Sequence, residues 1–308
     1  MSPPKGEGTR PSGGPGHRPR VGVLGLGRMG AAIARHLAVD HDVTGWDVRA
    51  VAVPGVSVAT DAAALMRDRD VVIACLPSPV ETSSVVEDPA FLEAFRSGDA
   101  VVVDASTSDP ASLRALAARI GCAGARIVDG PILGRPDRVG AWTIPLGGDA
   151  SAVARVRPVL ERLAARVEHI GPLGSGHAIK LLNNLMFGAI NVITAEAIAA
   201  CSYVGVDPQR FVDLVTGSQA ATVSPLFRDL APRMLGSGDE TVFSTALLAK
   251  DAALARGMCE AAGVPVRLAP HVAAAAAEAV AAGFGNEDSA AVVRLYLAGE
   301  AVDPSSSA

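Results

Sequence analysis

The chain has 308 residues, of which 49% are hydrophobic, 19% are charged and only 4% are aromatic, and its formal net charge is −5. This length suggests two domains, with ample apolar material for a core in each. The negative charge and the scarcity of aromatic side chains argue against a nucleic acid as the main partner.

The four cysteines and six histidines are dispersed along the chain. Neither type shows the short spacing that is typical of a zinc or redox motif, so we expect no metal site. The cysteines are expected to be small buried side chains of a protein kept in the reducing cytoplasm.

Residues 1–19 are rich in Pro, Gly and Ser and carry charges without periodicity, which predicts a disordered tail. The basic residues of this tail are not followed by the apolar run of a signal peptide, because the short run after them leads straight into a glycine-rich turn. Residues 303–308 are likewise expected to fray.

Residues 20–173 alternate short apolar runs with Ala-rich amphipathic segments. Continuous Val/Ile runs separated by helices indicate a parallel sheet covered on both faces. We therefore predict an α/β fold, with a doubly wound Rossmann domain whose ligand crevice lies at the carboxyl ends of the strands. Strands are expected at Val21–Gly25, Asp42–Asp47, Val71–Cys75, Ala100–Asp104, Arg126–Asp129, Trp142–Leu146 and Val167–Ile170, with helices at Met29–Leu37 and Ala111–Ile120.

Residues 174–302 carry no strand pattern and are expected to form an all-helical domain for substrate binding and dimerisation. The segment Leu181–Val206 is long and apolar, but Asn191 and Glu196 interrupt it. We interpret it as a helix buried on nearly all sides rather than a membrane span. Such a helix needs more partners than one small domain supplies, which predicts a homodimer or homotetramer. Further helices are expected from Asp207-Pro208, over Leu247–Ala262 and over Leu268–Ala282.

The motif Gly25-Leu26-Gly27-Arg28-Met29-Gly30 follows a predicted strand and opens a predicted helix. Gly25 permits a tight turn, Gly27 lets the backbone approach a pyrophosphate, and Gly30 allows close packing of helix on strand. The helix N-terminus offers N–H groups and a positive dipole end to the phosphates. In this context the motif predicts a dinucleotide-binding site, and a merely structural glycine turn is the alternative.

Asp47 ends the second predicted strand. A carboxylate there can accept both ribose hydroxyls of NAD and would repel the 2′-phosphate of NADP. Arg49 could instead pair with that phosphate, so NAD is the expected cofactor and NADP the alternative. Asp47 could also be an ordinary turn residue at a strand end.

The segment Gly174-Ser175-Gly176-His177-Ala178-Ile179-Lys180-Leu181-Leu182-Asn183-Asn184 opens the long helix. Lys180 and Asn184 are one helical turn apart and project from the same face. A lysine near a helix start is not favoured by the dipole, which prefers anions there. We therefore place the chemistry at this junction between the two domains.

With these motifs in order, the chain resembles the β-hydroxyacid dehydrogenase family, which includes 3-hydroxyisobutyrate dehydrogenases, from about residue 20 to residue 297. The resemblance implies an NAD(P)-dependent enzyme that interconverts a small β-hydroxy acid and its semialdehyde. It rests on Gly25–Gly30, Asp104-Ala105-Ser106-Thr107, Asp129-Gly130-Pro131 leading to Gly147-Gly148, Gly174–Asn184, Lys250-Asp251 and residues 283–290.

The resemblance implies a role at each matching position. Lys180 would be the general acid/base, because desolvation lowers the pKa of a lysine until it can exchange a proton near neutral pH. Asn184 would hold the substrate or the lysine in line. The remaining contacts would come from Leu76 and Pro77 at the adenine ribose, Ser106 and Thr107 at the nicotinamide ribose and the substrate, and Lys250 over the nicotinamide. Alternatively, Ser106 and Thr107 cap the next helix, and Lys250 is a solvated helix charge.

The stretch from Asp129 to Pro136 departs from the family pattern, in which a Ser and two Gly bind the substrate carboxylate. Here Leu133 replaces the hydroxyl, Gly134 follows, and Arg135 replaces the second glycine. Leucine cannot donate a hydrogen bond to a carboxylate, whereas an arginine could bind one through two N–H groups. The sequence therefore predicts either a larger or differently charged anionic substrate, or a more apolar substrate with Arg135 in solvent.

Two other functions stay open. Imine reductases resemble the same two-domain layout, but they usually lack a lysine where Lys180 stands. A non-catalytic cofactor-binding protein would be expected to lose Lys180 or Asn184. The expected partners are therefore a small carboxylate or carbonyl substrate and further copies of the chain, with no nucleic acid or membrane.

Overall fold

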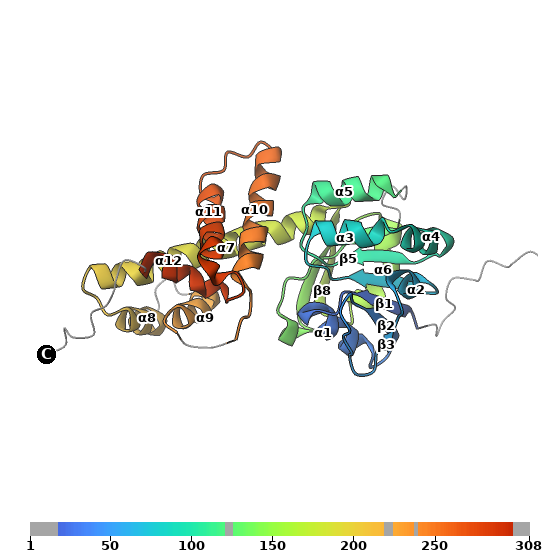
Figure 1. Cartoon of the computed structure of the whole chain (residues 1–308), viewed down its shortest axis with the longest axis horizontal. Helices are drawn as coiled ribbons and strands as arrows, with labels where there is room; N and C mark the ends of the chain where they lie inside the picture. The colour runs from blue at the N-terminus through green and yellow to red at the C-terminus, as the bar shows by residue number, and fades with distance from the viewer. Residues whose placement is uncertain (1–17, 121–125, 219–223, 237–239, 298–308) are drawn as a thin grey trace, which may run out of the picture. The chain divides into compact units, whose positions relative to one another are not determined.

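The computed structural model describes residues 18–120, 126–218, 224–236 and 240–297. Contacts between residues in space group the chain into two compact units (Figure 1). Unit 1 contains the chain up to Ser106 together with Leu116–Leu173, and unit 2 contains Thr107–Ala115 together with the chain from Gly174 onward. The predicted tails at 303–308 and, for all but two residues, at 1–19 lie outside the described residues, as does Cys122.

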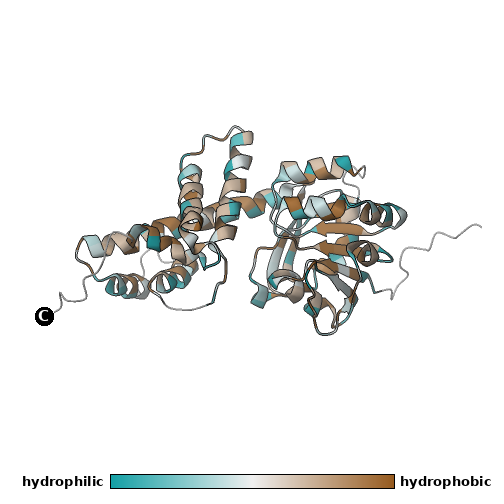
Figure 2. Ribbon diagram, viewed as in Figure 1, coloured by the Kyte–Doolittle hydropathy of each residue, from teal (hydrophilic) through white to brown (hydrophobic). Residues whose placement is uncertain are grey.

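Unit 1 is built on an eight-stranded sheet with the order β3-β2-β1-β4-β5-β6-β7-β8. The strand order reverses beside β1, which pairs in parallel with both β2 and β4, so the switch point of a doubly wound sheet lies here. The central strands are buried apolar runs, which Figure 2 shows as a hydrophobic band through this unit. The strands are β1 Arg20–Leu24, β2 Asp42–Trp46, β3 Ser57–Val58, β4 Val71–Ala74, β5 Val101–Asp104, β6 Ile127–Asp129, β7 Trp142–Gly147 and β8 Ala164–Gly171.

The helices that cover this sheet begin where the sequence supplies a cap. Ser78, Asp88 and Asp149 each accept a hydrogen bond from a backbone N–H in the first turn of the helix that follows, which satisfies a donor that the helix itself leaves open. The helices are α1 Arg28–Leu37, α2 Ala62–Met66, α3 Pro79–Val86, α4 Pro89–Ser97, α5 Pro110–Arg119, the 3₁₀ turn η1 Pro136–Arg138 and α6 Ala150–Leu160. The predicted α/β fold with a Rossmann sheet is confirmed.

The sheet is not parallel throughout, and the expectation of a parallel sheet is wrong at one pair. β6 and β7 run antiparallel, with Asp129 opposite Gly147. Only a loop and the single turn η1 connect them, with no helix to return the chain across the sheet as a crossover to a parallel neighbour usually requires. The edge strand β3 was not predicted, because its two exposed residues carry no apolar pattern.

Among its described residues, unit 2 contains helices and no strand. Its core forms where side chains such as Leu230, Leu248 and Val292 pack around α7. The helices are α7 Ser175–Tyr203, α8 Pro208–Gly217, α9 Pro225–Met234, α10 Thr245–Ala261, α11 Ala269–Ala279, the π turn η2 Val280–Phe284, the 3₁₀ turn η3 Ser289–Val293 and α12 Arg294–Leu297. Asp207 caps α8, as predicted, by accepting a hydrogen bond from the Gln209 N–H.

Helix α7 is only partly covered within one chain. It packs against α8, α9, α10, α11 and η3, but Ile179, Leu182, Met186 and Ile193 are exposed and follow one face at helical spacing. We call these four residues the α7 stripe. By length and composition alone α7 could cross a membrane, a test that core helices of soluble proteins also pass. One chain therefore does not bury α7 on nearly all sides, and its expected burial by a second subunit stays a prediction.

Candidate active site

The turn between β1 and α1 has two glycines that the chain itself requires. Gly25 has φ +88°, and a Cβ there would lie 2.4 Å from the carbonyl oxygen of Cys75. A Cβ on Gly30 would lie 1.8 Å from the carbonyl oxygen of Gly25. Any side chain at either position would therefore push the helix off the strand.

Gly27 differs from its two neighbours in the motif. Its φ is −66°, and a Cβ there would meet no protein atom within 4 Å. It is also the N-cap of α1, where it offers no side chain to the open N–H groups of the first turn, and that turn contains no acidic residue. Open space in front of an uncapped helix N-terminus suits a phosphate, so these residues fit a bound dinucleotide.

The rest of the motif has mixed exposure. Leu26 is buried against the position of Gly45, Met29 is partly buried against the core of unit 1, and Arg28 is exposed. The backbone N–H of Leu26 donates to the Oδ2 atom of Asp47 at 2.8 Å, which ties the glycine turn to the end of β2.

Asp47 is held as a carboxylate at the end of β2. Its side chain is only 7% exposed, and its Oδ1 atom accepts from the N–H of Arg49 at 2.9 Å and from its Nε at 3.1 Å. Burial opposes ionisation, but the hydrogen bonds from Arg49 and Leu26 outweigh it and lower the pKa of Asp47. The site therefore offers an ionised acceptor next to the glycine turn, as ribose hydroxyls require.

The loops after β4 and β5 are joined through Ser106. The N–H of Leu76 donates to Ser106 Oγ at 3.0 Å, and the N–H of Ser106 donates to Asp104 Oδ1 at 3.0 Å. Ser106 is 4% exposed, while Pro77 beside Leu76 is exposed. The structure thus shows a structural contact for Ser106, and its contact with the nicotinamide ribose or the substrate stays a prediction.

The loop in unit 1 that is predicted to bind a carboxylate, residues 133–135, is held in place by the indole of Trp142. The indole Nε1 donates to the carbonyl oxygen of Arg135 at 2.7 Å, and a Cβ on Gly134 would lie 2.2 Å from the indole ring. Leu133 exchanges two backbone hydrogen bonds with Thr143 in an antiparallel bridge. The side chain of Leu133 is partly buried and Arg135 is exposed. The role of Trp142 could not be predicted from the sequence, because the indole and the loop come together only in the folded chain.

In unit 2, the residue before α7 occupies a position that only glycine fits. Gly174 has φ +96°, and a Cβ there would lie 2.8 Å both from Pro110 Cβ and from Arg114 Nη1. The close approach brings the first turn of α7 against the segment 107–115 of the same unit. Lys180 lies in the next turn of the same helix.

Lys180 is a partly buried lysine whose ammonium is disfavoured by its surroundings. Desolvation by burial lowers the pKa of Lys180; the carboxylate of Asp251 opposes this shift and the ammonium of Lys250 adds to it. A lysine with a lowered pKa is able to give and take a proton under milder conditions than a solvated one.

Asn184, Asp251, Lys250 and Thr107 form one connected network in unit 2. The amide Nδ2 of Asn184 donates to Asp251 Oδ2 at 2.6 Å, and Lys250 Nζ lies 3.0 Å from Asp251 Oδ1. Lys250 Nζ also donates to the carbonyl oxygen of Thr107 at 3.1 Å. The network gathers four predicted or motif residues from α7, α10 and the segment before α5.

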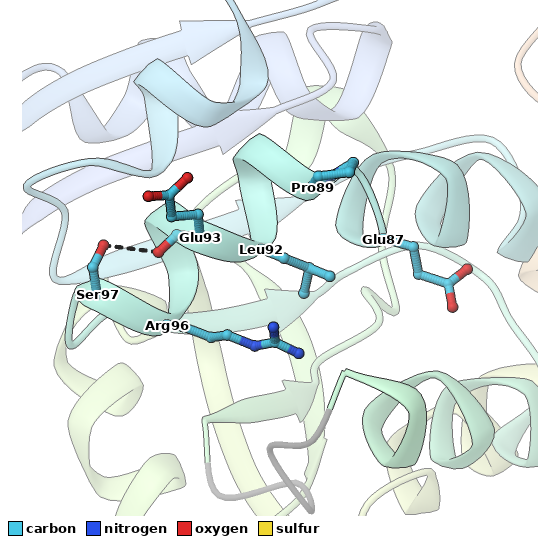
Figure 3. A pocket seen from close by; sticks show the side chains of 6 residues that line it. All are labelled: Glu87, Pro89, Leu92, Glu93, Arg96 and Ser97. Carbon is cyan, nitrogen blue, oxygen red and sulfur yellow. Dashed lines mark hydrogen bonds between the residues drawn. The ribbon is translucent and has the colours of Figure 1, made fainter.

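The described residues contain no group of three or more His, Cys, Asp or Glu side chains that could hold a metal ion. A shallow groove on α3 and α4 is lined by Glu87, Pro89, Leu92, Glu93, Arg96 and Ser97, none of which is a predicted site residue. Figure 3 shows the carboxylate of Glu93 and the guanidinium of Arg96 on opposite sides of α4, so the polar groups do not converge. This groove is not a candidate active site.

Residues 20–171 match the family described as NAD binding domain of 6-phosphogluconate dehydrogenase. Residues 174–296 match the family described as NAD-binding of NADP-dependent 3-hydroxyisobutyrate dehydrogenase. A protein of Mycobacterium tuberculosis named "Probable 3-hydroxyisobutyrate dehydrogenase" is 30% identical over 266 residues, which cover 82% of this chain and 90% of that protein.

Solved structures agree with this likeness. The structure of a Mycobacterium tuberculosis 3-hydroxyisobutyrate dehydrogenase with L-serine superposes with a TM-score of 0.78 at 29% identity, covering 91% of this chain and 99% of that chain. An imine reductase of Streptomyces aurantiacus superposes with a TM-score of 0.58 at 22% identity, covering 90% of this chain and 99% of that chain, a likeness of fold alone.

Proposed function

Because the chain belongs to the β-hydroxyacid dehydrogenase family, we propose that it is an NAD(P)-dependent oxidoreductase that interconverts a small β-hydroxy acid and its semialdehyde, with Lys180 as general acid/base. The observation that carries this proposal is the partial burial of Lys180 one helical turn from Asn184 and its buried network with Asp251, an environment that lowers the pKa of the lysine. An ordinary surface lysine would have neither the desolvation nor the buried network beside it.

The nicotinamide, when bound, supplies or accepts the hydride. In reduction, the ammonium of Lys180 gives a proton to the carbonyl oxygen of the substrate. In oxidation, the neutral amine of Lys180 takes the proton of the substrate hydroxyl. Because each direction needs one protonation state, the rate of reduction falls and the rate of oxidation rises as pH increases through the pKa of Lys180.

We propose NAD as the preferred cofactor and NADP as the poorer one. The ionised carboxylate of Asp47 can accept from two ribose hydroxyls, and the same charge repels a 2′-phosphate. Arg49 is ion-paired with Asp47, so it partly offsets that repulsion. The glycine turn and the uncapped start of α1 serve both cofactors equally.

For the substrate we propose a small aldehyde with an acidic group bound by Arg135. Arg135 is exposed, and its backbone is held by Trp142, so the guanidinium extends from a fixed point. Guanidinium binds a carboxylate through two parallel N–H donors, an interaction that neither Leu133 nor Gly134 can make through its side chain.

A turnover panel tests this function. We expect NADH-dependent reduction of aldehydes with a carboxylate or sulfonate, slower reduction of matched aldehydes without an acidic group, and a higher kcat/KM with NADH than with NADPH. Arg135→Ala should raise KM for the acidic aldehydes only, since the neutral ones do not use the guanidinium. Equal turnover of both aldehyde classes would refute the acidic substrate, and preferred turnover of cyclic imines would support an imine reductase instead.

We also propose a homodimer formed through the α7 stripe, in a cytoplasmic protein. The exposed stripe offers apolar side chains at helical spacing, which a second copy can cover. Cys75, Cys201 and Cys259 are free thiols, a state that a reducing compartment maintains.

Charging the stripe should separate the copies. Met186→Asp places a carboxylate at a side chain that is 66% exposed in one chain, so the folded monomer tolerates it, whereas an apolar interface does not. Light scattering at micromolar concentration should give a dimer mass for the natural chain and a monomer mass for the variant. The matched control is Leu214→Asp, at an exposed leucine of α8 outside the stripe, which should leave the mass unchanged. A monomeric natural chain would contradict this proposal.

A further inference from the structure

The amide of Asn184 is held in one orientation. Asp251 pairs with the ammonium of Lys250, and as a carboxylate it can only accept hydrogen bonds, so the nitrogen of the amide must face it. The oxygen of the amide, Oδ1, points to the other side, where it accepts from Asn183 Nδ2 at 3.1 Å. Asn184 therefore presents its acceptor oxygen on the side away from Asp251.

The carboxylate of Asp251 is buried and contacts two side chains. Its side chain is 3% exposed, its Oδ2 atom binds Asn184 and its Oδ1 atom faces Lys250. Burying a carboxylate in this way costs free energy that a well-packed apolar residue would not. If Asp251 had a purely structural role, an apolar residue at this position of α10 would stabilise the fold more.

The charge of Asp251 also acts on Lys180. Of the charged side chains described on the packed helices, Asp251 and Lys250 on α10 act on Lys180 with opposite signs; His177 is the titratable neighbour on α7 itself. The negative charge of Asp251 raises the pKa of Lys180 against the effect of burial, and the positive charge of Lys250 lowers it. One carboxylate therefore touches Asn184 and biases Lys180.

We propose that Asp251 is a positioning residue of the reaction: its carboxylate holds the Asn184 amide in one orientation, one helical turn from Lys180, and its negative charge acts on that lysine. This inference rests on the proposed role of Lys180 as acid. One N–H of the Asn184 amide is engaged by Asp251, so its acceptor oxygen faces away from that carboxylate.

The test is the pH profile of Asp251→Asn, which keeps the shape of the side chain and removes its charge. Removing the negative charge lowers the pKa of Lys180, so the fall of reduction rate with rising pH should move down by about one pH unit or more. The rise of the oxidation rate with increasing pH should also move to lower pH. We call each of these pH-dependent changes in rate a limb of the profile. Lys250→Met removes a positive charge beside the same lysine, so it should move both limbs to higher pH.

Three measurements separate the outcomes. Glu260→Gln removes an exposed carboxylate further along α10, and its profile should match the natural chain. Asp251→Glu restores the charge without the geometry, so it should keep the position of the limb and lower kcat. Titration of ¹³C-lysine signals in the apo protein, with Lys180 assigned by Lys180→Arg, reads the same shift without turnover.

An Asp251→Asn variant whose limb and lysine titration match the natural chain, with only its Tm lowered, would reduce Asp251 to a structural residue and overturn the inference. Failure of the proposed function looks different: Lys180→Ala would then leave the limb of the natural chain in place, whatever the apo titration shows. A shift in the apo titration together with an unchanged rate profile would also overturn the inference, since the charge would act on a lysine that does not set the rate.

Discussion

Lys180→Ala should lower kcat for aldehyde reduction by about 10²- to 10⁴-fold, the usual contribution of a positioned acid or base. The affinity for NADH should stay close to that of the natural chain, because the proposed phosphate contacts and the ribose contact of Asp47 lie in unit 1 and do not involve Lys180. The measurements are single-turnover reduction for the chemical step and fluorescence titration for the cofactor. Since the pH limb comes from Lys180, it should disappear in the variant.

The matched control is Lys180→Arg, which keeps a positive charge but cannot release a proton near neutral pH. It should bind substrate better than Lys180→Ala and still lack the limb. Stability should change little in either variant, because Asp251 keeps its contacts with Asn184 and Lys250. Turnover of Lys180→Ala within a few-fold of the natural chain, with the limb intact, would remove Lys180 from the mechanism.

Gly30→Ala should destabilise the folded protein and abolish cofactor binding, whereas Gly27→Ala should affect the cofactor alone. A methyl group on Gly30 would lie 1.8 Å from the Gly25 carbonyl oxygen, so α1 would have to move off β1. A methyl group on Gly27 would meet no protein atom within 4 Å, at a backbone conformation that alanine adopts freely. It would occupy the space proposed for the pyrophosphate.

The comparison needs two measurements on each variant. Thermal unfolding of the apo protein should show a lower Tm for Gly30→Ala and an unchanged Tm for Gly27→Ala. The free energy of unfolding of Gly30→Ala should fall by about 1–3 kcal/mol or more, the usual cost of overpacking. Calorimetric titration with NADH should show weak binding for both. If Gly27→Ala bound NADH as tightly as the natural chain, the phosphate site would not lie at this turn.

Much of the cofactor half was predictable because its signals are local. The glycine spacing after an apolar run specifies a strand, a tight turn and a helix within a few residues, and the structure places β1 and α1 there. Two further features are local as well. The N-cap at Asp207 depends on a side chain that accepts from an N–H of the first turn, and the shared face of Lys180 and Asn184 follows from helix periodicity. The antiparallel β7 was not predictable in this way, because its direction depends on how a loop returns to the sheet.

The sequence by itself determined the two kinds of domain, the glycine turn and the spacing of Lys180 and Asn184, because each follows from apolar periodicity or from backbone conformation over a few residues. Only the tertiary structure decided that Asp251 faces Asn184 across 67 residues of chain, that Trp142 holds the carbonyl of Arg135, and that one face of α7 stays uncovered in a single chain. Contacts of this kind join segments that are distant in sequence, so they depend on packing that leaves no periodic mark on the chain.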